Sequence, residues 1–425
     1  MLLRDTQVFT PNDFPEHTYV ERADDRLEEK LRNALSIPKQ PISISGPSKS
    51  GKTALVERVI GPDNMIKVSG VEIRTANDLW ERVLDWMDSP SSTVVADTLS
   101  QSAQERVSAS ASFGPGTSVT GEISAQAGIA KTTTESRARS GLPQVSREIG
   151  KSDYIVFLDD FHYIQSDLQE QVAREIKAAA ERDIKICIAS VPHRSDDVVR
   201  GNHELRGRTL NIDTQFWNPQ DLEKIAALGF AKLNVELQES DVHALAEQAC
   251  GSPQLMQSIC LDACRKLGVR QTAIGVRRIS ISPGDLREIL ENTSMRTDYS
   301  SLVRDLHQGP RTKGQPRHKF TFGDQTTGDV YRCVLLALRR DPPHFQIPYA
   351  ELIERVNAVC ISNAPISGSI QNACRQMTSI AREHSPANRI LEWDDRTGSG
   401  TFSIVDPYFL FFLRHSNKLQ DLMGS

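Results

Sequence analysis

One stretch constrains the fold of this chain more than any other. An alternating apolar run, Ile42–Ser45, leads into the loop GPSKSGKT, Gly46–Thr53, and an amphipathic helix is expected from Ala54 to Ile60. The loop fits the spacing GxxxxGK[ST] in the strand–loop–helix context that this spacing requires. The stretch therefore predicts a sheet strand that presents a phosphate-binding loop at its carboxyl end.

The residue types in this loop suit a nucleoside triphosphate. Gly46 and Gly51 let the main chain curl so that backbone N–H groups point inward at a helix N-terminus. Lys52 is expected to reach the β- and γ-phosphates, and the Thr53 hydroxyl to hold Mg²⁺. The other expected nucleotide contacts are Pro47, Ser48, Lys49, Ser50 and Ala54. ATP and Mg²⁺ are thus the predicted cofactors; the alternative is a chance Gly-Lys-Thr at a helix start.

Composition narrows the class of protein. A chain of 425 residues allows two or three domains. The net charge of −5 means that any contact with nucleic acid requires a local basic patch. No apolar run is long enough to span a membrane, and the polar start does not resemble a signal peptide, so a cytoplasmic protein is predicted. Seven scattered cysteines predict buried thiols rather than a disulfide framework or a zinc site.

A pair of acids follows the most apolar strand candidate. Five consecutive apolar residues, Tyr154 to Leu158, predict a strand buried on both faces, and Asp159 and Asp160 stand at its carboxyl end. Ligands of open α/β sheets bind at this end of the strands. Asp159 is expected in the Mg²⁺ shell, and Asp160 is expected to polarise the attacking water as general base. The alternative is that both acids cap the next helix.

The segment from residue 89 to 141 differs in composition from the rest. It is dense in Ser, Thr, Ala and Gly, so it is not expected in the main core. Strict alternation over 107–113 and 119–127, around the turn 114–117, predicts an inserted β-hairpin suited to self-assembly or strand exchange. A disordered insert and a membrane-inserting hairpin are the alternatives.

The second half of the chain is mostly helical. Three helices are expected after Trp217, and Gly251–Pro253 separates the second from the third. Residues 274–318 are basic and contain Gly-Pro, which predicts a connector with a domain boundary near 310 to 325.

The C-terminal part has the element order of a winged helix. Helices are expected over 328–340, 348–359 and 367–384, followed by strands over 390–393 and 401–405. The third helix offers a modest basic and amide face: Gln371, Asn372, Arg375, Gln376 and Arg382. A winged helix binds DNA or another protein, and the sequence leaves both partners open.

Together these motifs resemble prokaryotic STAND or origin-recognition-like AAA+ ATPases. The resemblance rests on Gly46–Thr53, Leu158–Asp160, Gly251–Pro253 and the ending DPYFLFFLR at 406–414. It implies an α/β fold: a P-loop NTPase parallel sheet over 1–213, which carries the insertion, then a helical lid over 214–310 and a winged-helix domain over 320–425. Its apolar ending is expected to form a last helix that packs on the wing.

The resemblance also implies further site residues. Arg22 is expected in an entry motif near the adenine and ribose, although Glu21 replaces the usual glycine before it. The alternative is a chance arginine before a surface helix. Pro253 is expected to pack on the adenine, unless Gly251 and Pro253 only end one helix and start the next. The strand 184–190 is expected to end in a γ-phosphate sensor, Ser190, with His193 nearby. An arginine finger or sensor is expected among Arg194, Arg200, Arg206 and Arg208, with Arg206 as first choice.

The implied function is an ATP-dependent switch. Lys52, Asp160 and Arg206 are the expected catalytic residues, and self-association on ATP binding is expected. In one class of function the protein is a signalling or defence-related scaffold with an effector protein as partner. In the other it is a DNA-binding ATPase of replication initiation, transposition or DNA remodelling. The acidic net charge and the acids Asp394 and Asp395 of the expected wing favour the first.

Overall fold

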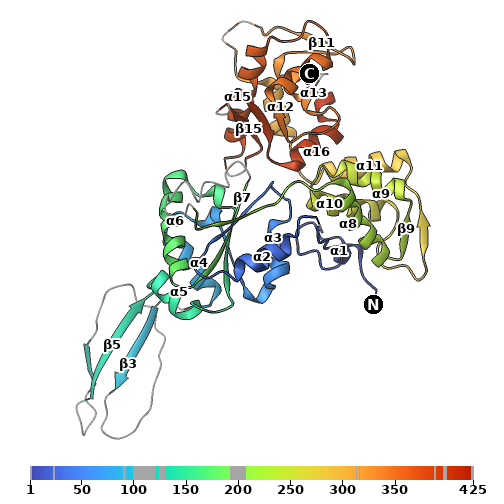
Figure 1. Cartoon of the computed structure of the whole chain (residues 1–425). Coiled ribbons are helices and arrows are strands. Elements are labelled where there is room, and N and C mark those ends of the chain that lie inside the picture. Colours follow the sequence, from blue (N-terminus) through green and yellow to red (C-terminus); the bar gives the residue numbers. More distant parts are fainter. Residues whose placement is uncertain are drawn as a thin grey trace. The chain divides into compact units, whose positions relative to one another are not determined.

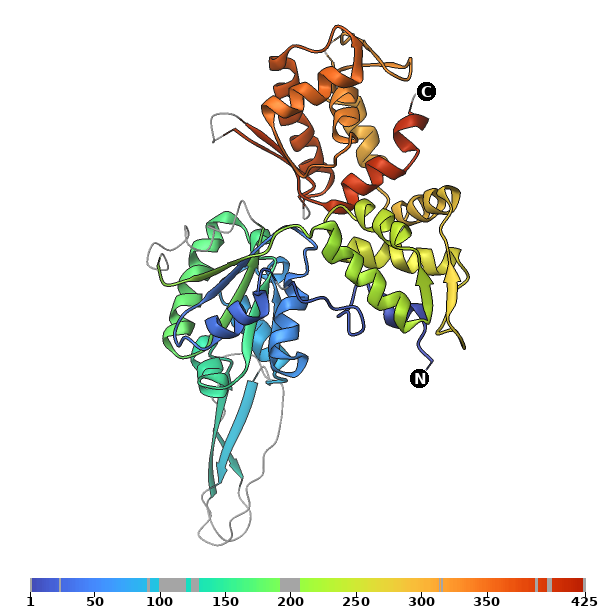
Figure 2. The same ribbon diagram turned by 45° about the vertical axis from the view of Figure 1, so that its right-hand side comes forward.

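The structure is a computed structural model that describes residues 2–22, 24–89, 92–98, 120–123, 130–191, 207–312, 314, 316–386, 389–395 and 400–422. It divides into two compact units. The sheet unit comprises Leu31–Ile44 and Ile60–Ile212, and the loop unit comprises Met1–Lys30, Ser45–Val59 and Asp213–Ser425. Figures 1 and 2 show the elements of each unit in two views.

A five-stranded sheet forms the centre of the sheet unit. Its order is β2 (Met65–Ser69), β6 (Ile155–Asp159), β7 (Lys185–Ser190), β1 (Ile42–Ser45) and β8 (Leu210–Asp213). Strands β2, β6 and β7 are parallel. Every residue of β1 and β6 is buried, as expected for strands covered on both faces. The predicted α/β class with a parallel sheet is confirmed.

Helices and short turns complete the core of the sheet unit. The elements are α2 (Leu27–Leu35), η1 (Pro62–Asn64), η2 (Gly70–Glu72), α4 (Asp78–Trp86), α5 (Leu142–Ile149), η3 (Phe161–Tyr163) and α6 (Ser166–Glu181). Trp80 and Phe161 are fully buried in a cluster of mostly aliphatic side chains. The Trp80 indole N–H donates to Glu175 at 2.7 Å, so this large ring is buried without losing its hydrogen bond.

In chain order, the strands of a separate antiparallel sheet come after α4 and before α5. Its order is β3 (Ser92–Thr98), β5 (Ala130–Ala138) and β4 (Thr120–Ile123). Ser92 is opposite Ala138, and Thr120 is opposite Thr133. The expected hairpin is only partly right: residues 107–113 lie outside the described residues, and β4 pairs with β5. The strands at 92–98 and 130–138 were missed because their signal is β-branched residues rather than apolar alternation.

The N-terminal residues belong to the core of the loop unit. Helix α1 (Asp5–Val8) is followed by Phe9, and both Val8 and Phe9 are fully buried. The Phe9 ring lies 5.2 Å from the Phe230 ring, and a Cβ on Gly229 would come within 2.2 Å of it. The sequence carries no local signal for this packing, because a short apolar pair has no periodicity to detect.

A helical region follows the sheet in the chain. It contains α8 (Pro219–Lys232), β9 (Val235–Leu237), α9 (Glu239–Gln248), α10 (Pro253–Lys266), β10 (Arg277–Ile279), α11 (Pro283–Ser294) and α12 (Ser300–Gln308). The predicted connector over 274–318 is wrong, because it contains β10, α11 and α12. Helix α11 has a capping box at Ser282 and Pro283 at its first position, and it buries Ile289 and Leu290.

Among its described residues, the last part of the loop unit contains five helices and six short strands. Its elements are β11 (Phe320–Phe322), β12 (Thr327–Gly328), α13 (Val330–Leu338), β13 (Gln346–Pro348), α14 (Tyr349–Val359), β14 (Cys360–Ser362), α15 (Ser367–His384), β15 (Leu391–Asp394), β16 (Thr401–Ile404), α16 (Pro407–His415) and α17 (Lys418–Asp421). Strands β15 and β16 are antiparallel. Helix α16 buries seven consecutive residues, Pro407–Leu413, and contacts α11 as well as β16.

A buried histidine makes this region sensitive to acid. Burial, followed by the charges of Arg414 and Arg339, lowers the pKa of His415 to about 3 from an ordinary 6.5. Below pH 6.5, His415 therefore takes up a proton in the unfolded chain but stays neutral in the folded chain. The contribution of neutral His415 to the free energy of unfolding is thus complete above pH 6.5 and is lost as the pH falls towards 3.

Between pH 6.5 and 4.5 we expect this group to remove roughly 2–3 kcal/mol from the free energy of unfolding. Thermal unfolding of wild type and His415→Asn at pH 7 and pH 4.5 measures it, and the variant should lose less stability on acidification. His318→Asn, at an exposed position, is the control. Equal acid sensitivity of wild type and His415→Asn would contradict the expectation.

Candidate nucleotide-binding site

The loop Gly46–Thr53 follows β1 directly and continues into α3 (Lys52–Ile60). Its backbone has positive φ at Lys49 (60°) and at Gly51 (91°). A Cβ atom on Gly46 would lie 1.7 Å from Thr214 Oγ1, so only glycine fits there. The two glycines of the motif are thus required for different reasons, close approach at Gly46 and backbone conformation at Gly51.

The Lys52 side chain folds over the start of the loop. Its Nζ donates to the carbonyl oxygens of Gly46 at 2.9 Å and Pro47 at 2.7 Å. Thr53 and Ala54 lie in the first turn of α3, where backbone N–H groups and the helix dipole favour an anion. The loop therefore combines a cation, a helix N-terminus and a tightly curved backbone.

Residues far along the chain hold the loop in shape. The Ser50 hydroxyl lies 3.1 Å from the Thr214 hydroxyl, and the Trp217 indole N–H donates to the Ser50 carbonyl at 3.0 Å. The Ser252 hydroxyl donates to the Lys49 carbonyl at 3.2 Å. Sequence reasoning missed Thr214 and Trp217 as supports; a tryptophan just after the last sheet strand was the available signal.

The two residues expected around the base lie next to these supports. The Arg22 side chain is 6% exposed, pairs with Asp25 at 3.1 Å, and lies over the Trp217 ring at 5.2 Å. Its Nη1 also donates to the Gln215 carbonyl at 3.2 Å. Pro253 Cγ lies 3.8 Å from where a Cβ on Gly51 would be. Arg22 is therefore connected to the loop through Trp217, and Pro253 lies beside Gly51.

Local preferences also account for the Gly-x-Pro sequence. Gly251 has φ of 67° just after α9, Ser252 is the N-cap of α10, and Pro253 is the first residue of α10. A Cβ on Gly251 would lie 2.9 Å from the Phe216 Cβ, so glycine is needed for space as well.

The acid pair lies in the sheet unit. Asp159 is the last residue of β6, and its Oδ1 accepts from the Asp160 N–H at 3.0 Å while its Oδ2 lies 3.5 Å from Lys67 Nζ. Asp160 is left-handed, with φ of 57° and ψ of 38°, and its side chain makes no capping hydrogen bond to η3. Helix capping therefore does not account for Asp160.

Ser190 ends β7, the strand next to β6. Its side chain is buried, with 1% exposure, and its hydroxyl oxygen has no hydrogen-bond partner in the described part of the chain. Because the carboxyl ends of parallel strands meet at one edge of a sheet, Ser190 and Asp159 lie on the same edge of neighbouring strands. A buried hydroxyl without a partner is costly unless it serves a ligand.

The expected arginine finger is not located. Arg194, Arg200 and Arg206, together with His193, lie outside the described residues. Arg208 is described, and it lies 3.9 Å from Glu181 in an exposed ion pair.

The described residues contain neither a cluster of metal ligands nor a helix that could span a membrane. Within the described ranges, His, Cys, Asp and Glu form no group of three that could hold a metal ion. None of the helices described is both long and apolar enough to cross a membrane. The seven cysteines are free thiols, and all but Cys360 are buried.

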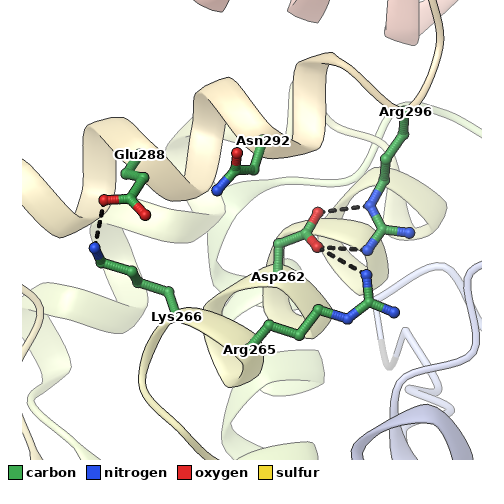
Figure 3. A pocket seen from close by; sticks show the side chains of 6 residues that line it. All are labelled: Asp262, Arg265, Lys266, Glu288, Asn292 and Arg296. Carbon is green, nitrogen blue, oxygen red and sulfur yellow. Dashed lines mark hydrogen bonds and ion pairs between the residues drawn. The ribbon is translucent and has the colours of Figure 1, made fainter.

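A separate polar pocket lies between α10 and α11 (Figure 3). It has a volume of about 610 Å³ and is lined by Asp262, Arg265, Lys266, Glu288, Asn292 and Arg296. Arg296 and Arg265 pair with Asp262, and Lys266 pairs with Glu288. Each of its charged side chains therefore has an ion-pair partner within the protein, and no predicted site residue lines the pocket.

The chain is similar to several solved structures at low sequence identity. No protein-family model matches this chain, and no curated protein sequence matches it. The ORC2 protein of Aeropyrum pernix, solved as ADPNP–ADP complexes, is 12% identical with a TM-score of 0.50, and 100% of each chain is covered. Cdc6p from Pyrobaculum aerophilum is 12% identical with a TM-score of 0.42, again over 100% of each chain.

A Walker-type ATPase of Pyrococcus abyssi is 13% identical over 93% of this chain and 96% of its own, with a TM-score of 0.47. At these identities the similarity concerns the fold. The chain has the α/β fold of the P-loop NTPases, with the phosphate loop after β1 and the acid pair after β6.

Proposed function

We propose that this chain is a Mg²⁺-dependent ATPase that works as a molecular switch, of the STAND or origin-recognition-like AAA+ type that its motifs resemble. The observation that carries this proposal is the loop itself: Gly46 sits where no Cβ fits, and Lys52 is held over the curve of the loop. The structurally similar ORC2 protein was solved with ADPNP and ADP, which supports an adenine nucleotide as ligand.

Each site residue has a chemical role in this proposal. The backbone of Gly46–Thr53 and the N-terminus of α3 bind the phosphates, and Lys52 exchanges two loop carbonyls for phosphate oxygens. The Thr53 hydroxyl and the Asp159 carboxylate are hard oxygen ligands of the kind Mg²⁺ prefers. Mg²⁺, when bound, would neutralise charge on the phosphates. Arg22 and Pro253 flank the base.

The sheet edge supplies the hydrolytic groups. Asp160 is a left-handed residue directly after a buried strand, and unusual backbone conformations gather at functional sites. Asp160 would orient the attacking water and accept its proton. The Ser190 hydroxyl, buried and without a described partner, would donate to the γ-phosphate. Arg206 remains our first choice for an arginine that stabilises transferred charge, supplied in cis or by a neighbouring copy.

The helices α13–α15 and the β15–β16 hairpin would form a winged helix that binds a protein partner. Arg375 of the third helix pairs with Asp395 at 2.9 Å, and Gln376 accepts from the Tyr331 hydroxyl. Because these groups already have partners, they are poorly placed to read DNA. The proposed role is a cytoplasmic signalling or defence-related scaffold that assembles when ATP binds.

DNA is the alternative partner. The element order suits a winged helix, and the face of α15 leaves Asn372 and Arg382 exposed. A DNA-binding ATPase of replication initiation, transposition or remodelling would use that face. An ATP switch of either kind must favour its assembled state by several kcal/mol on nucleotide binding to act decisively.

Light scattering tests whether the chain assembles on ATP binding and whether DNA is a partner. The full chain is measured with Mg²⁺, with and without a non-hydrolysable ATP analogue, and each condition is repeated with duplex DNA. We expect a mass increase with the analogue alone and no further increase with DNA. A monomer in all four conditions contradicts assembly, and a salt-sensitive mass increase that requires DNA favours the alternative.

A further inference from the structure

The phosphate loop is joined to the C-terminal helix α16 by an ion pair. Lys49 Nζ lies 2.8 Å from Asp406 Oδ1 and 3.1 Å from Oδ2. Nζ also lies over the Tyr408 ring, 4.2 Å from its centroid. The exposed fractions are 29% for the Lys49 side chain and 14% for Asp406, so water screens the pair less than it screens an open surface pair.

The carboxylate of Asp406 has further hydrogen-bond partners besides Lys49. Asp406 is the N-cap of α16 and accepts from the Tyr408 N–H at 2.9 Å. It also accepts from the Tyr299 hydroxyl at 2.6 Å. The Tyr408 hydroxyl in turn lies 2.9 Å from the Ser258 hydroxyl of α10. These hydrogen bonds orient the carboxylate towards the loop, where Lys49 pairs with it.

The lysine is also oriented from the loop side. Lys49 has a left-handed backbone, and its carbonyl accepts from the Ser252 hydroxyl at 3.2 Å. Lys49 and Lys52 are the two cations within Gly46–Thr53. Lys52 lies on loop carbonyls, whereas the charge of Lys49 is neutralised by Asp406. The positive charge that the loop offers to an anion is thus reduced by a residue of α16.

We propose that Asp406 and Lys49 form a charge latch through which nucleotide occupancy of the loop is read by the C-terminal helix. This inference rests on the proposed function. Negative charge bound at the loop attracts Lys49 and repels Asp406, so it weakens the latch and loosens α16. By reciprocity, an engaged latch lowers the affinity of the loop for nucleotide. Asp406 acts here as a positioning residue.

Opposite effects of two neutralising substitutions test the latch. Asp406→Asn keeps an N-cap acceptor and removes a negative charge, so we expect nucleotide to bind about fivefold more tightly. Lys49→Met keeps an unbranched apolar side chain and removes a positive charge, so we expect about fivefold weaker binding. The double variant should return close to wild type. Affinity is measured with a fluorescent ATP analogue and Mg²⁺.

Asp341→Asn is the matched control. Asp341 pairs with Arg414 at the other end of α16, at 2.8 Å, and is 82% exposed, so the same charge change is made away from the loop. Its nucleotide affinity should equal that of wild type. Changes of the same sign in Asp406→Asn and Lys49→Met, or no change in either, would show that the pair only supports folding and would overturn the latch.

Hydrogen exchange supplies a second readout. In wild type, a non-hydrolysable ATP analogue should speed exchange of the α16 amides, and in Asp406→Asn these amides should exchange fast without nucleotide. Unchanged or slower exchange of the wild-type amides on nucleotide addition overturns the latch. A wild-type chain that binds no nucleotide overturns the proposed function as well, whereas normal binding with unresponsive variants overturns the latch alone.

Discussion

Lys52→Ala is expected to abolish measurable ATP binding. The Lys52 ammonium group lies against the carbonyls of Gly46 and Pro47, inside the curve that a phosphate chain would follow. Charge-assisted hydrogen bonds contribute about 1.5–3 kcal/mol each. Loss of two such bonds predicts at least roughly a hundredfold weaker binding. Titration calorimetry with Mg²⁺ and a non-hydrolysable ATP analogue measures this change.

Two further variants separate charge from geometry at this position. Lys52→Arg keeps the charge on a longer, planar group and should still bind poorly, because the curve of the loop admits a single compact ammonium group. Lys30→Ala removes an exposed lysine of α2 and should bind like wild type. Thermal unfolding should be close to wild type in all three variants. Intact ATP affinity in Lys52→Ala would refute the assignment of the loop as the nucleotide site.

Asp160→Asn is expected to bind ATP but not to hydrolyse it. The substitution removes the proton acceptor and keeps the side-chain shape, and asparagine tolerates the left-handed backbone that Asp160 adopts. Loss of a general base lowers kcat by about 10²–10⁴-fold. ATP affinity should stay within about twofold of wild type, because only the transition state requires this group. Phosphate release under saturating ATP measures kcat.

The control lies at the other end of the same strand. Asp153 precedes β6, its side chain is 93% exposed, and it pairs with Lys185 at 3.3 Å. Asp153→Asn makes the same chemical change away from the carboxyl edge and should keep wild-type turnover. If Asp160→Asn also retains turnover, Asp160 is not the general base, and another acid or a bound water network must activate the nucleophile.

Elements with a strong local signal were predicted well. Helix α15 begins at Ser367 and ends at His384, as its periodicity indicated. Strand β6 begins one residue after the start of the predicted apolar run, at Ile155, and ends at Asp159. Such segments carry their information in neighbouring residues: an apolar repeat, a cap or a glycine that only one backbone conformation needs.

Elements with a weak or misleading local signal were not predicted correctly. The stretch 274–318 is rich in arginine and contains Gly-Pro, yet it includes α11 and α12, whose buried faces are short. The burial of Phe9 was not predicted because one aromatic residue shows no periodicity, although it fills the space beside Gly229. In both cases burial against another segment decided the structure, and burial is not a local property.

By itself, the sequence determined that a glycine-rich loop follows a buried strand, that two acids follow another, and which residue types could hold a triphosphate. Only the tertiary structure decided that Thr214 packs against Gly46 and that Asp406 pairs with Lys49. It also decided that Trp217 contacts both Arg22 and the loop. Lys49 and Asp406 are 357 positions apart. No periodicity or motif connects residues at that separation, because their contact depends on how α16 packs against the rest of the loop unit.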